Sequence, residues 1–159
     1  MRRAVRAVER WVHGRAGRTP DHGSALVEFV GLVLLLLVPL VYLVLVVGRL
    51  QAGSFAAESA ALDAARVFVA SDGPAAAPSR ALAAAGVALA DQGFDDDPAD
   101  AVAIACSTGC LEPGSEVTVD VVVRVPLPFV PPVVRSAVPL EIPVSARRTA
   151  AVDEFREAP

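Results

Sequence analysis

The chain of 159 residues contains no lysine and no asparagine, and its only two histidines, His13 and His22, lie within the first 23 residues. The lack of Asn excludes N-linked glycosylation, which needs an Asn acceptor. From Ser24 onward the chain also lacks the usual general base, the commonest zinc ligand and the amine that forms Schiff bases. These absences argue against catalysis and against a zinc centre over most of the chain.

Charge is distributed unevenly along the chain. Residues 1–23 carry six Arg and two acidic residues, a net charge of +4, whereas residues 49–159 carry eight Arg and fifteen acidic residues, a net charge of −7. So acidic a segment does not favour a nucleic-acid partner. It also has no Gly-rich loop of the kind that binds phosphates. We therefore expect no nucleic acid, no small-molecule substrate, no cofactor, no catalytic residue and no enzymatic activity.

One long apolar run separates the two charged segments. Residues 29–48 read FVGLVLLLLVPLVYLVLVVG, twenty residues without a charge, in a chain whose mean hydropathy is +0.53. As an α-helix this run would cover about 30 Å, the thickness of the hydrocarbon core of a bilayer. Because Arg-rich segments stay in the cytoplasm, the sequence predicts a single-pass protein of the cytoplasmic membrane, with its N-terminus inside and its acidic part outside.

A basic start followed by an apolar run also describes a secretory signal peptide. The apolar core of a signal peptide is about 7 to 15 residues long, which is shorter than this run. A conceivable cleavage site for signal peptidase lies only further on, near residues 57–59. Two alternatives therefore stay open: an uncleaved membrane anchor with a small external binding or structural domain, and a secreted binding module that begins near residue 60.

An acidic side chain, Glu28, lies at the start of the apolar helix, five residues after Gly23. A lone carboxylate near a bilayer is costly unless it is protonated or paired, and the next basic residue is Arg49. If the chain is cut after Gly23, the new α-ammonium of Ser24 shares a helix face with Glu28. Glu28 would also lie in the first helical turn, where the helix dipole favours negative charge. One cleavage thus explains the glycine, the acid and their spacing.

This arrangement of leader, Gly23, Glu28 and apolar helix resembles a type IV prepilin processing site. The wider string at 24–53, SALVEFVGLVLLLLVPLVYLVLVVGRLQAG, is similar to the TadE-like minor pseudopilins of tight-adherence (Tad) pilus systems. The similarity continues through 56–66, and AVDEFRE at 151–157 is similar to the closing residues of some such proteins. The leader of 23 residues is long for a pilin, and Ser24 replaces the Phe common at this position in major pilins.

The resemblance implies a processing step and a set of partners. A prepilin peptidase would cut between Gly23 and Ser24, and Glu28 would then help to dock the subunit into a pilus. The chain would be a substrate of that peptidase and not an enzyme. Its partners would be the lipid bilayer, the prepilin peptidase and other pilin or pseudopilin subunits, and its location the cytoplasmic membrane or the pilus itself.

The sequence predicts an α+β fold, in which a long N-terminal pilin-like transmembrane helix precedes a short helix and a small antiparallel β-sheet. Asp72-Gly73-Pro74 ends the long helix near residue 71. The expected segments are a basic cytoplasmic leader (1–23), a transmembrane helix (24–48), its extracytoplasmic extension (49–71) and a small α+β extracytoplasmic domain (72–159).

Small residues recur every four positions in the helix extension, at Gly53, Ala57, Ala61 and Ala65. Such a stripe lets another backbone approach closely. Its partner is either a neighbouring subunit or the chain's own domain, and the sequence leaves both open.

Within the outer domain we expect a second helix at 80–91, with Ser79 as its N-cap and Gly93 after its end. The four acids within 95–100 lack the ligand spacing of an EF-hand, which predicts a solvated turn and no metal site. Strands are expected at 101–106, 117–125 and 140–147. Pro143 confines the last strand to a sheet edge or places the proline on a side of the strand that donates no hydrogen bond.

Cys106 and Cys110 are the only two cysteines. Because the predicted orientation places them outside the cell, where disulfides persist, we expect them to form one. A loop this short would stabilise the fold by about 2 kcal/mol in the chain-entropy model.

Overall fold

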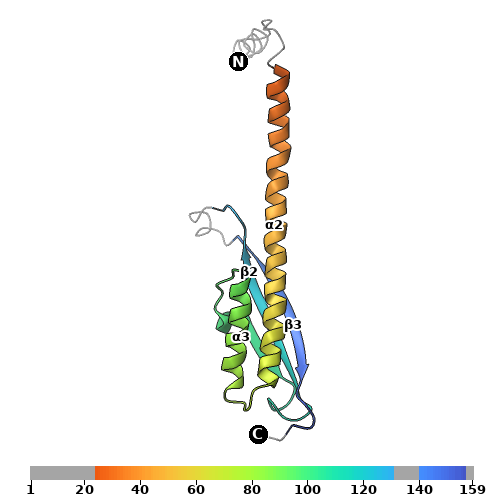
Figure 1. Cartoon of the computed structure of the whole chain (residues 1–159), viewed down its shortest axis with the longest axis vertical. Helices are drawn as coiled ribbons and strands as arrows, with labels where there is room; N and C mark the ends of the chain where they lie inside the picture. The colour runs from red at the N-terminus through yellow and green to blue at the C-terminus, as the bar shows by residue number, and fades with distance from the viewer. Residues whose placement is uncertain (1–23, 131–139, 157–159) are drawn as a thin grey trace, which may run out of the picture. The chain divides into compact units, whose positions relative to one another are not determined.

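The structure, a computed structural model, describes residues 24–130 and 140–156 (Figure 1). The chain divides into two compact units, Met1–Tyr42 and Leu43–Pro159. The expected leader at 1–23, with Gly23, lies outside the described residues.

Helix α2 (Ser24–Val69) provides the described part of the first unit and continues into the second. The expected helix from 24 to 71 is thus confirmed to within two residues. Pro39 lies inside α2. Because proline has no N–H, one backbone hydrogen bond is missing there, which membrane helices tolerate. The helix ends at Val69, and Gly73 and Pro74 follow in the turn that leads to the next helix.

The second unit has the α+β fold class that the sequence predicted, and it includes the part of α2 that follows Tyr42. The last part of α2 is followed by α3 (Ala77–Asp91), α4 (Pro98–Ala101), β1 (Val102–Cys106), β2 (Glu116–Pro126) and β3 (Glu141–Ala151). The three strands form one antiparallel sheet in the order β1-β2-β3. In Figure 1 the end of α2 and helix α3 run along this sheet.

Strand β2 supplies one side of the core. Its alternate valines, which the sequence predicted to share a face, are all at most 2% exposed: Val117, Val119, Val121, Val123 and Val125. Alternation with a period of two is the pattern of a half-buried strand, and this prediction is confirmed. Val122, on the opposite face, is 43% exposed.

Strand β3 lies at an edge of the sheet, one of the two placements that Pro143 allowed, but it runs to Ala151 and so beyond the expected end at 147. The last part of β3 has few large apolar residues, and polar pairs on the solvent face hold it to β2 instead. Thr149 pairs with Thr118, their hydroxyl oxygens 3.1 Å apart, and Arg147 pairs with Asp120. Such pairs stabilise antiparallel strands.

The small-residue stripe of α2 is buried inside the chain's own domain. Ala57, Ala61 and Ala65 are at most 1% exposed, within the core that contains the β2 valines. At Gly53, an added Cβ would lie only 2.3 Å from Cγ2 of Val125. Of the two alternatives that the sequence left open, the structure therefore supports packing within the domain.

Helix α3 begins three residues earlier than expected, and Ser79 is not its N-cap. Ala76 occupies the cap position without a side-chain hydrogen bond, and the Ser79 hydroxyl donates to the Ala76 carbonyl at 3.0 Å. Pro78 explains the early start, because proline suits the first helical turn, where its missing N–H costs nothing. The expected end is confirmed, since Gly93 has a φ of +71°.

The acidic segment after α3 contains a helical turn where the sequence predicted only a solvated loop. Asp97 accepts a hydrogen bond from the backbone N–H of Ala99 at 2.9 Å and thereby caps α4. Among the described residues, no group of three or more His, Cys, Asp or Glu side chains is placed to hold a metal ion.

Replacing Gly53 by alanine should destabilise the domain, because the new methyl group would collide with Val125. We expect Gly53→Ala to be about 1–3 kcal/mol less stable than Gly48→Ala, a matched control in the same helix whose added Cβ meets nothing within 4 Å. The measurement is hydrogen exchange of the β2 amides in the full chain in detergent. Equal exchange in the two variants would contradict the close packing at Gly53.

Candidate membrane-anchor and assembly site

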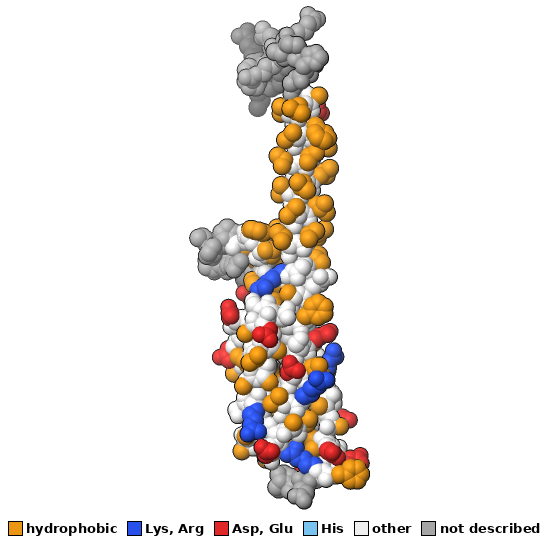
Figure 2. All heavy atoms as spheres, viewed as in Figure 1, with side chains coloured by type: hydrophobic (Ala, Val, Ile, Leu, Met, Phe, Trp, Pro, Cys, Tyr) orange, Lys and Arg blue, Asp and Glu red, His pale blue; other side chains and the backbone are white. Residues whose placement is uncertain are grey.

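The apolar part of α2 presents hydrophobic side chains on all sides. Every large hydrophobic residue from Leu26 to Leu45 is exposed, and Figure 2 shows the upper part of this helix covered with hydrophobic side chains. By length and composition, α2 is the one helix among the described residues that could cross a membrane. A helix that is apolar all round suits a bilayer or a protein interior. The chain is thus compatible with a single-pass membrane anchor.

Glu28 interrupts this apolar surface. Its side chain is exposed, and it has no hydrogen-bond or ion-pair partner among residues 24–130 and 140–156. Ser24 is the first residue of α2, so Glu28 follows it by four residues, or about 6 Å along the helix axis. Gly23 lies outside the described residues, and for Ser24 the structure describes only the backbone.

The expectation that Glu28 lies in the first helical turn is wrong. Because α2 begins at Ser24, its first turn contains no acidic residue, and Glu28 opens the second turn. The field of the helix dipole falls off within the first turn, so it stabilises Glu28 less than expected. The negative charge of Glu28 must then be balanced by a positively charged group close to its carboxylate.

Arg49, the first charged residue after the apolar run, binds the end of α3. Its Nη2 donates to the Gly93 carbonyl at 2.8 Å, and its Nη1 donates to the Gln92 carbonyl at 3.5 Å. Its guanidinium also lies 4.3 Å from the ring centroid of Phe94. Arg49 thus binds two carbonyls of the turn that directly follows α3, and it ties α2 to this turn. This role was not predicted, because no local sequence signal pairs residues so far apart in the chain.

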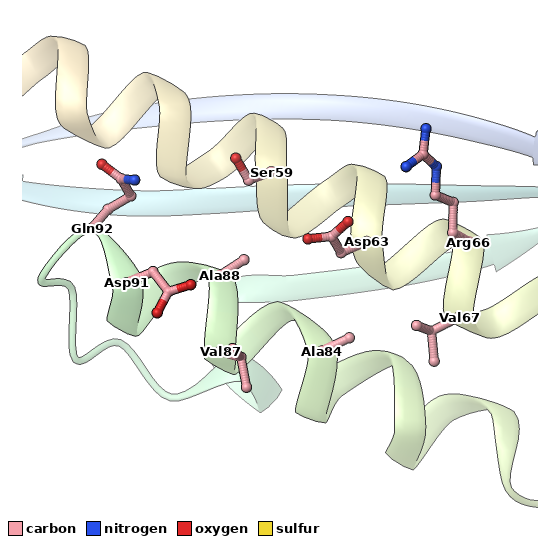
Figure 3. A pocket seen from close by; sticks show the side chains of 9 residues that line it. All are labelled: Ser59, Asp63, Arg66, Val67, Ala84, Val87, Ala88, Asp91 and Gln92. Carbon is pink, nitrogen blue, oxygen red and sulfur yellow. The ribbon is translucent and has the colours of Figure 1, made fainter.

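A groove of about 600 Å³ lies between α2 and α3 (Figure 3). From α2 it is lined by Ser59, Asp63, Arg66 and Val67, and from α3 by Ala84, Val87, Ala88, Asp91 and Gln92. The lining contains no His, Cys or Lys.

Cys106 and Cys110 form a disulfide, as expected, with their Cα atoms 5.4 Å apart. It closes the turn that follows β1. The same turn is held by the Ser107 N–H, which donates to the Glu116 carbonyl at 2.9 Å, and by the Gly109 N–H, which donates to the Glu112 carboxylate at 3.2 Å. The disulfide therefore has a structural position, beside the buried Leu111.

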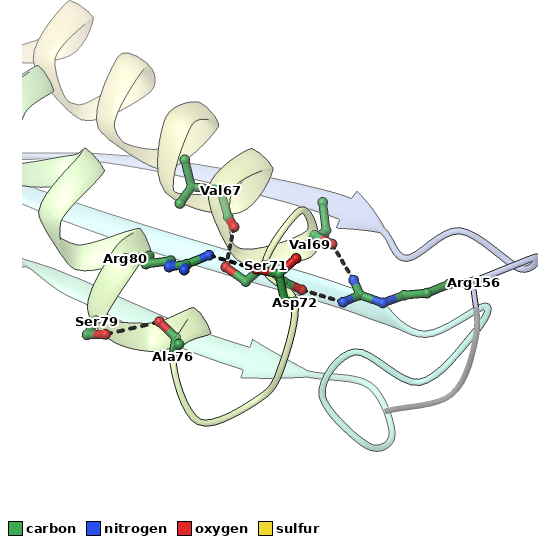
Figure 4. A network of polar contacts seen from close by, with 8 residues as sticks. All are labelled: Val67, Val69, Ser71, Asp72, Ala76, Ser79, Arg80 and Arg156. Carbon is green, nitrogen blue, oxygen red and sulfur yellow. Dashed lines mark hydrogen bonds and ion pairs between the residues drawn. The ribbon is translucent and has the colours of Figure 1, made fainter.

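The C-terminal segment closes the end of α2 (Figure 4). Arg156 donates from Nη1 to the Val69 carbonyl at 2.7 Å and from Nη2 to the Ser71 carbonyl. Val152 is buried, and its N–H donates to the Ser115 carbonyl at 2.8 Å. Val152 and Arg156 therefore have a structural role at the end of α2, which the sequence did not predict.

Two exposed ion pairs hold β3, one to the neighbouring strand β2 and one to helix α2. Asp120 accepts a hydrogen bond from Nε of Arg147 on the neighbouring strand at 2.5 Å, and this carboxylate raises the pKa of the Arg147 guanidinium above its ordinary value. Because arginine is protonated at any physiological pH, the shift has no consequence for chemistry there. Arg148 lies 3.6 Å from the Glu58 carboxylate and links β3 to α2. Both pairs are exposed and structural.

No known protein family, curated protein or solved structure matches the chain.

The predicted site residues fall into two groups that belong to different units. Ser24 and Glu28 lie in the first unit, whereas Cys106 and Cys110 lie in the second.

Removing the Arg156 guanidinium should loosen the end of α2, because the Val69 and Ser71 carbonyls would lose a charged donor. We expect Arg156→Met to cost about 1–3 kcal/mol, seen as faster hydrogen exchange in the last turn of α2 in the full chain. Arg80→Met is the matched control, since Arg80 makes only an exposed ion pair with Asp72 at 3.4 Å. Equal effects of the two substitutions would rule out the role assigned to Arg156.

Proposed function

We propose that the chain is a membrane-inserted minor pseudopilin, similar to TadE, that is cut after Gly23 and assembles with a Tad or type IV-like pilus. The observation that carries the proposal is Glu28. This exposed acidic residue opens the second turn of a helix whose other exposed side chains, up to Leu45, are almost all apolar. A plain membrane anchor gains nothing from an acid in this place.

Cleavage after Gly23 would supply the countercharge that Glu28 needs. In a bilayer, a lone carboxylate among Leu26, Val27 and Phe29 costs several kcal/mol. The α-ammonium created at Ser24 would lie on the same helix face as Glu28, within the same chain or on a neighbouring one. Because the helix dipole contributes little at this position, the ammonium carries the compensation.

The burial of the small-residue stripe limits which surfaces can contact other subunits. Gly53, Ala57, Ala61 and Ala65 are used within the domain. Subunit contacts in a pilus would therefore use the apolar half of α2, whose hydrophobic side chains the fold leaves exposed. The same surface faces lipid before assembly and neighbouring helices afterwards.

The disulfide and the charge distribution both support the proposed orientation. A structural disulfide persists outside the cytoplasm, which fits an extracytoplasmic second unit. The Arg-rich leader fits a cytoplasmic N-terminus.

The first residue of the mature protein tests the processing step. We expect mass spectrometry of the protein from a membrane fraction to return Ser24 as the N-terminal residue. Gly23→Leu should retain the leader, because a bulky residue would block the peptidase, whereas the control Gly17→Leu should be cut normally. An intact N-terminus in the wild-type protein would support the uncleaved anchor instead. A start near residue 60 would support the secreted module.

Neutralising Glu28 should separate membrane insertion from assembly. We expect Glu28→Gln and Glu28→Val to insert normally, as judged by resistance to carbonate extraction, but to enter filaments about tenfold less, since a charge-assisted contact is lost. Val27→Ala, at the adjacent exposed position, is the control. Wild-type incorporation of the Glu28 variants into pili would remove Glu28 from the mechanism.

A further inference from the structure

An apolar turn follows β2 at the end of the domain where α2 enters it. Together with Val44, Leu45, Gly48, Arg49 and Ala52 of α2, residues Pro126, Leu127, Pro128 and Phe129 line a groove of about 690 Å³. Val44 to Gly48 form the last turn of the apolar run. The turn at 126–129 therefore lies at the level where the apolar run of α2 ends.

Phe129 is displayed at the tip of this turn. Its side chain is 78% exposed, and its φ of +61° lies in the left-handed region that bulky residues rarely adopt. The fold thus keeps a strained backbone conformation at a residue whose ring makes little contact with the domain. Strain of this kind marks sites where a local conformation serves a function.

The described surface around Phe129 is mostly apolar, and the exposed Glu141 lies at its border, opposite Pro126 in the β2–β3 ladder. Beyond the paired residues Pro126 and Glu141, the described residues of the β2–β3 connection are all apolar: Leu127, Pro128, Phe129, Val130 and Leu140. The groove's only charged residue, Arg49, is held by the Gln92 and Gly93 carbonyls and by the Phe94 ring. Figure 2 shows hydrophobic side chains gathered at this end of the second unit, with acidic and basic ones scattered over the rest.

We propose that Phe129 inserts into the outer interface of the same bilayer that α2 crosses, so that the domain rests on the membrane at a second point beside its helix. This inference depends on the proposed membrane anchorage but not on pilus assembly. The occupant of the surface is lipid because the turn adjoins the last apolar turn of α2, which itself ends at the interface. Aromatic side chains favour this depth, where a ring meets both hydrocarbon and headgroups.

Tryptophan fluorescence in vesicles tests the depth of Phe129. The full chain, with its single Trp removed by Trp11→Phe, receives one reporter at a time: Phe129→Trp, Phe155→Trp or Tyr42→Trp. Phe155 is the matched control, because it is 93% exposed but lies beside Arg156, whose contacts are with the far end of α2. Each protein is reconstituted into phosphatidylcholine and phosphatidylglycerol vesicles, with and without phosphatidylcholine brominated near the headgroup.

We expect brominated lipid to quench the Phe129→Trp reporter severalfold more than the Phe155→Trp reporter, and the emission of the Phe129→Trp protein to be blue-shifted. Equal, weak quenching of these two variants, with strong quenching of Tyr42→Trp, would overturn the insertion of Phe129 while leaving the anchor in place. No quenching of Tyr42→Trp would show that the anchorage itself is wrong. Blue-shifted emission from Phe129→Trp that brominated lipid does not quench would also overturn the proposal, because a second copy of the chain would then cover the turn.

Discussion

The close approach of α2 to strand β2 is the contact on which the rest of the domain depends. It is possible only because α2 presents residues without bulk: at Gly53 there is no room even for a methyl group beside Val125. The valines of β2 then fill the space that larger helix side chains would otherwise occupy. Protein interiors are packed as densely as organic crystals. Small residues on the helix therefore require branched residues on the strand, because together they fill the space between the two elements.

This contact divides the surface of α2 between two environments. In the second unit, the helix buries a small-residue face and carries exposed charges such as Glu58 on the other side. Before Val47, its side chains are apolar on nearly every side and exposed. Arg49 lies where these two parts of α2 meet, and its guanidinium donates hydrogen bonds to the Gln92 and Gly93 carbonyls, just after α3. One part of α2 is thus suited to an apolar environment and the other is packed in the folded domain.

Much of this fold could be predicted from residue patterns. The period of two in β2, the length of the apolar run, the limit that Pro143 sets on the place of β3 and the disulfide all depend on local rules, and each is confirmed. The errors concern choices between competing local signals. Ser79 is a good N-cap in isolation, but the preceding Ala77-Pro78 also suits a first turn and forms it.

The long-range contacts could not be predicted in the same way. The sequence shows a small-residue stripe but not its partner, because a neighbouring subunit and the chain's own sheet demand the same spacing. The bonds from Arg49 to Gln92 and from Arg156 to Val69 join residues 43 and 87 positions apart. For the predicted processing site, Ser24 and Glu28 share α2 as expected, but the position of Glu28 in the second turn depends on where the helix begins.

The hydrogen bonds from Arg156 to the end of α2 have a mechanical consequence. Strand β2 runs alongside the last part of the helix, so a pull along the α2 axis loads their packed faces in shear, and all contacts along them must yield together. Arg156 donates one hydrogen bond to the Val69 carbonyl at the end of the helix and one to the Ser71 carbonyl just beyond it, and so resists sliding at that end. A domain built in this way carries tension along its own helix without first opening its sheet.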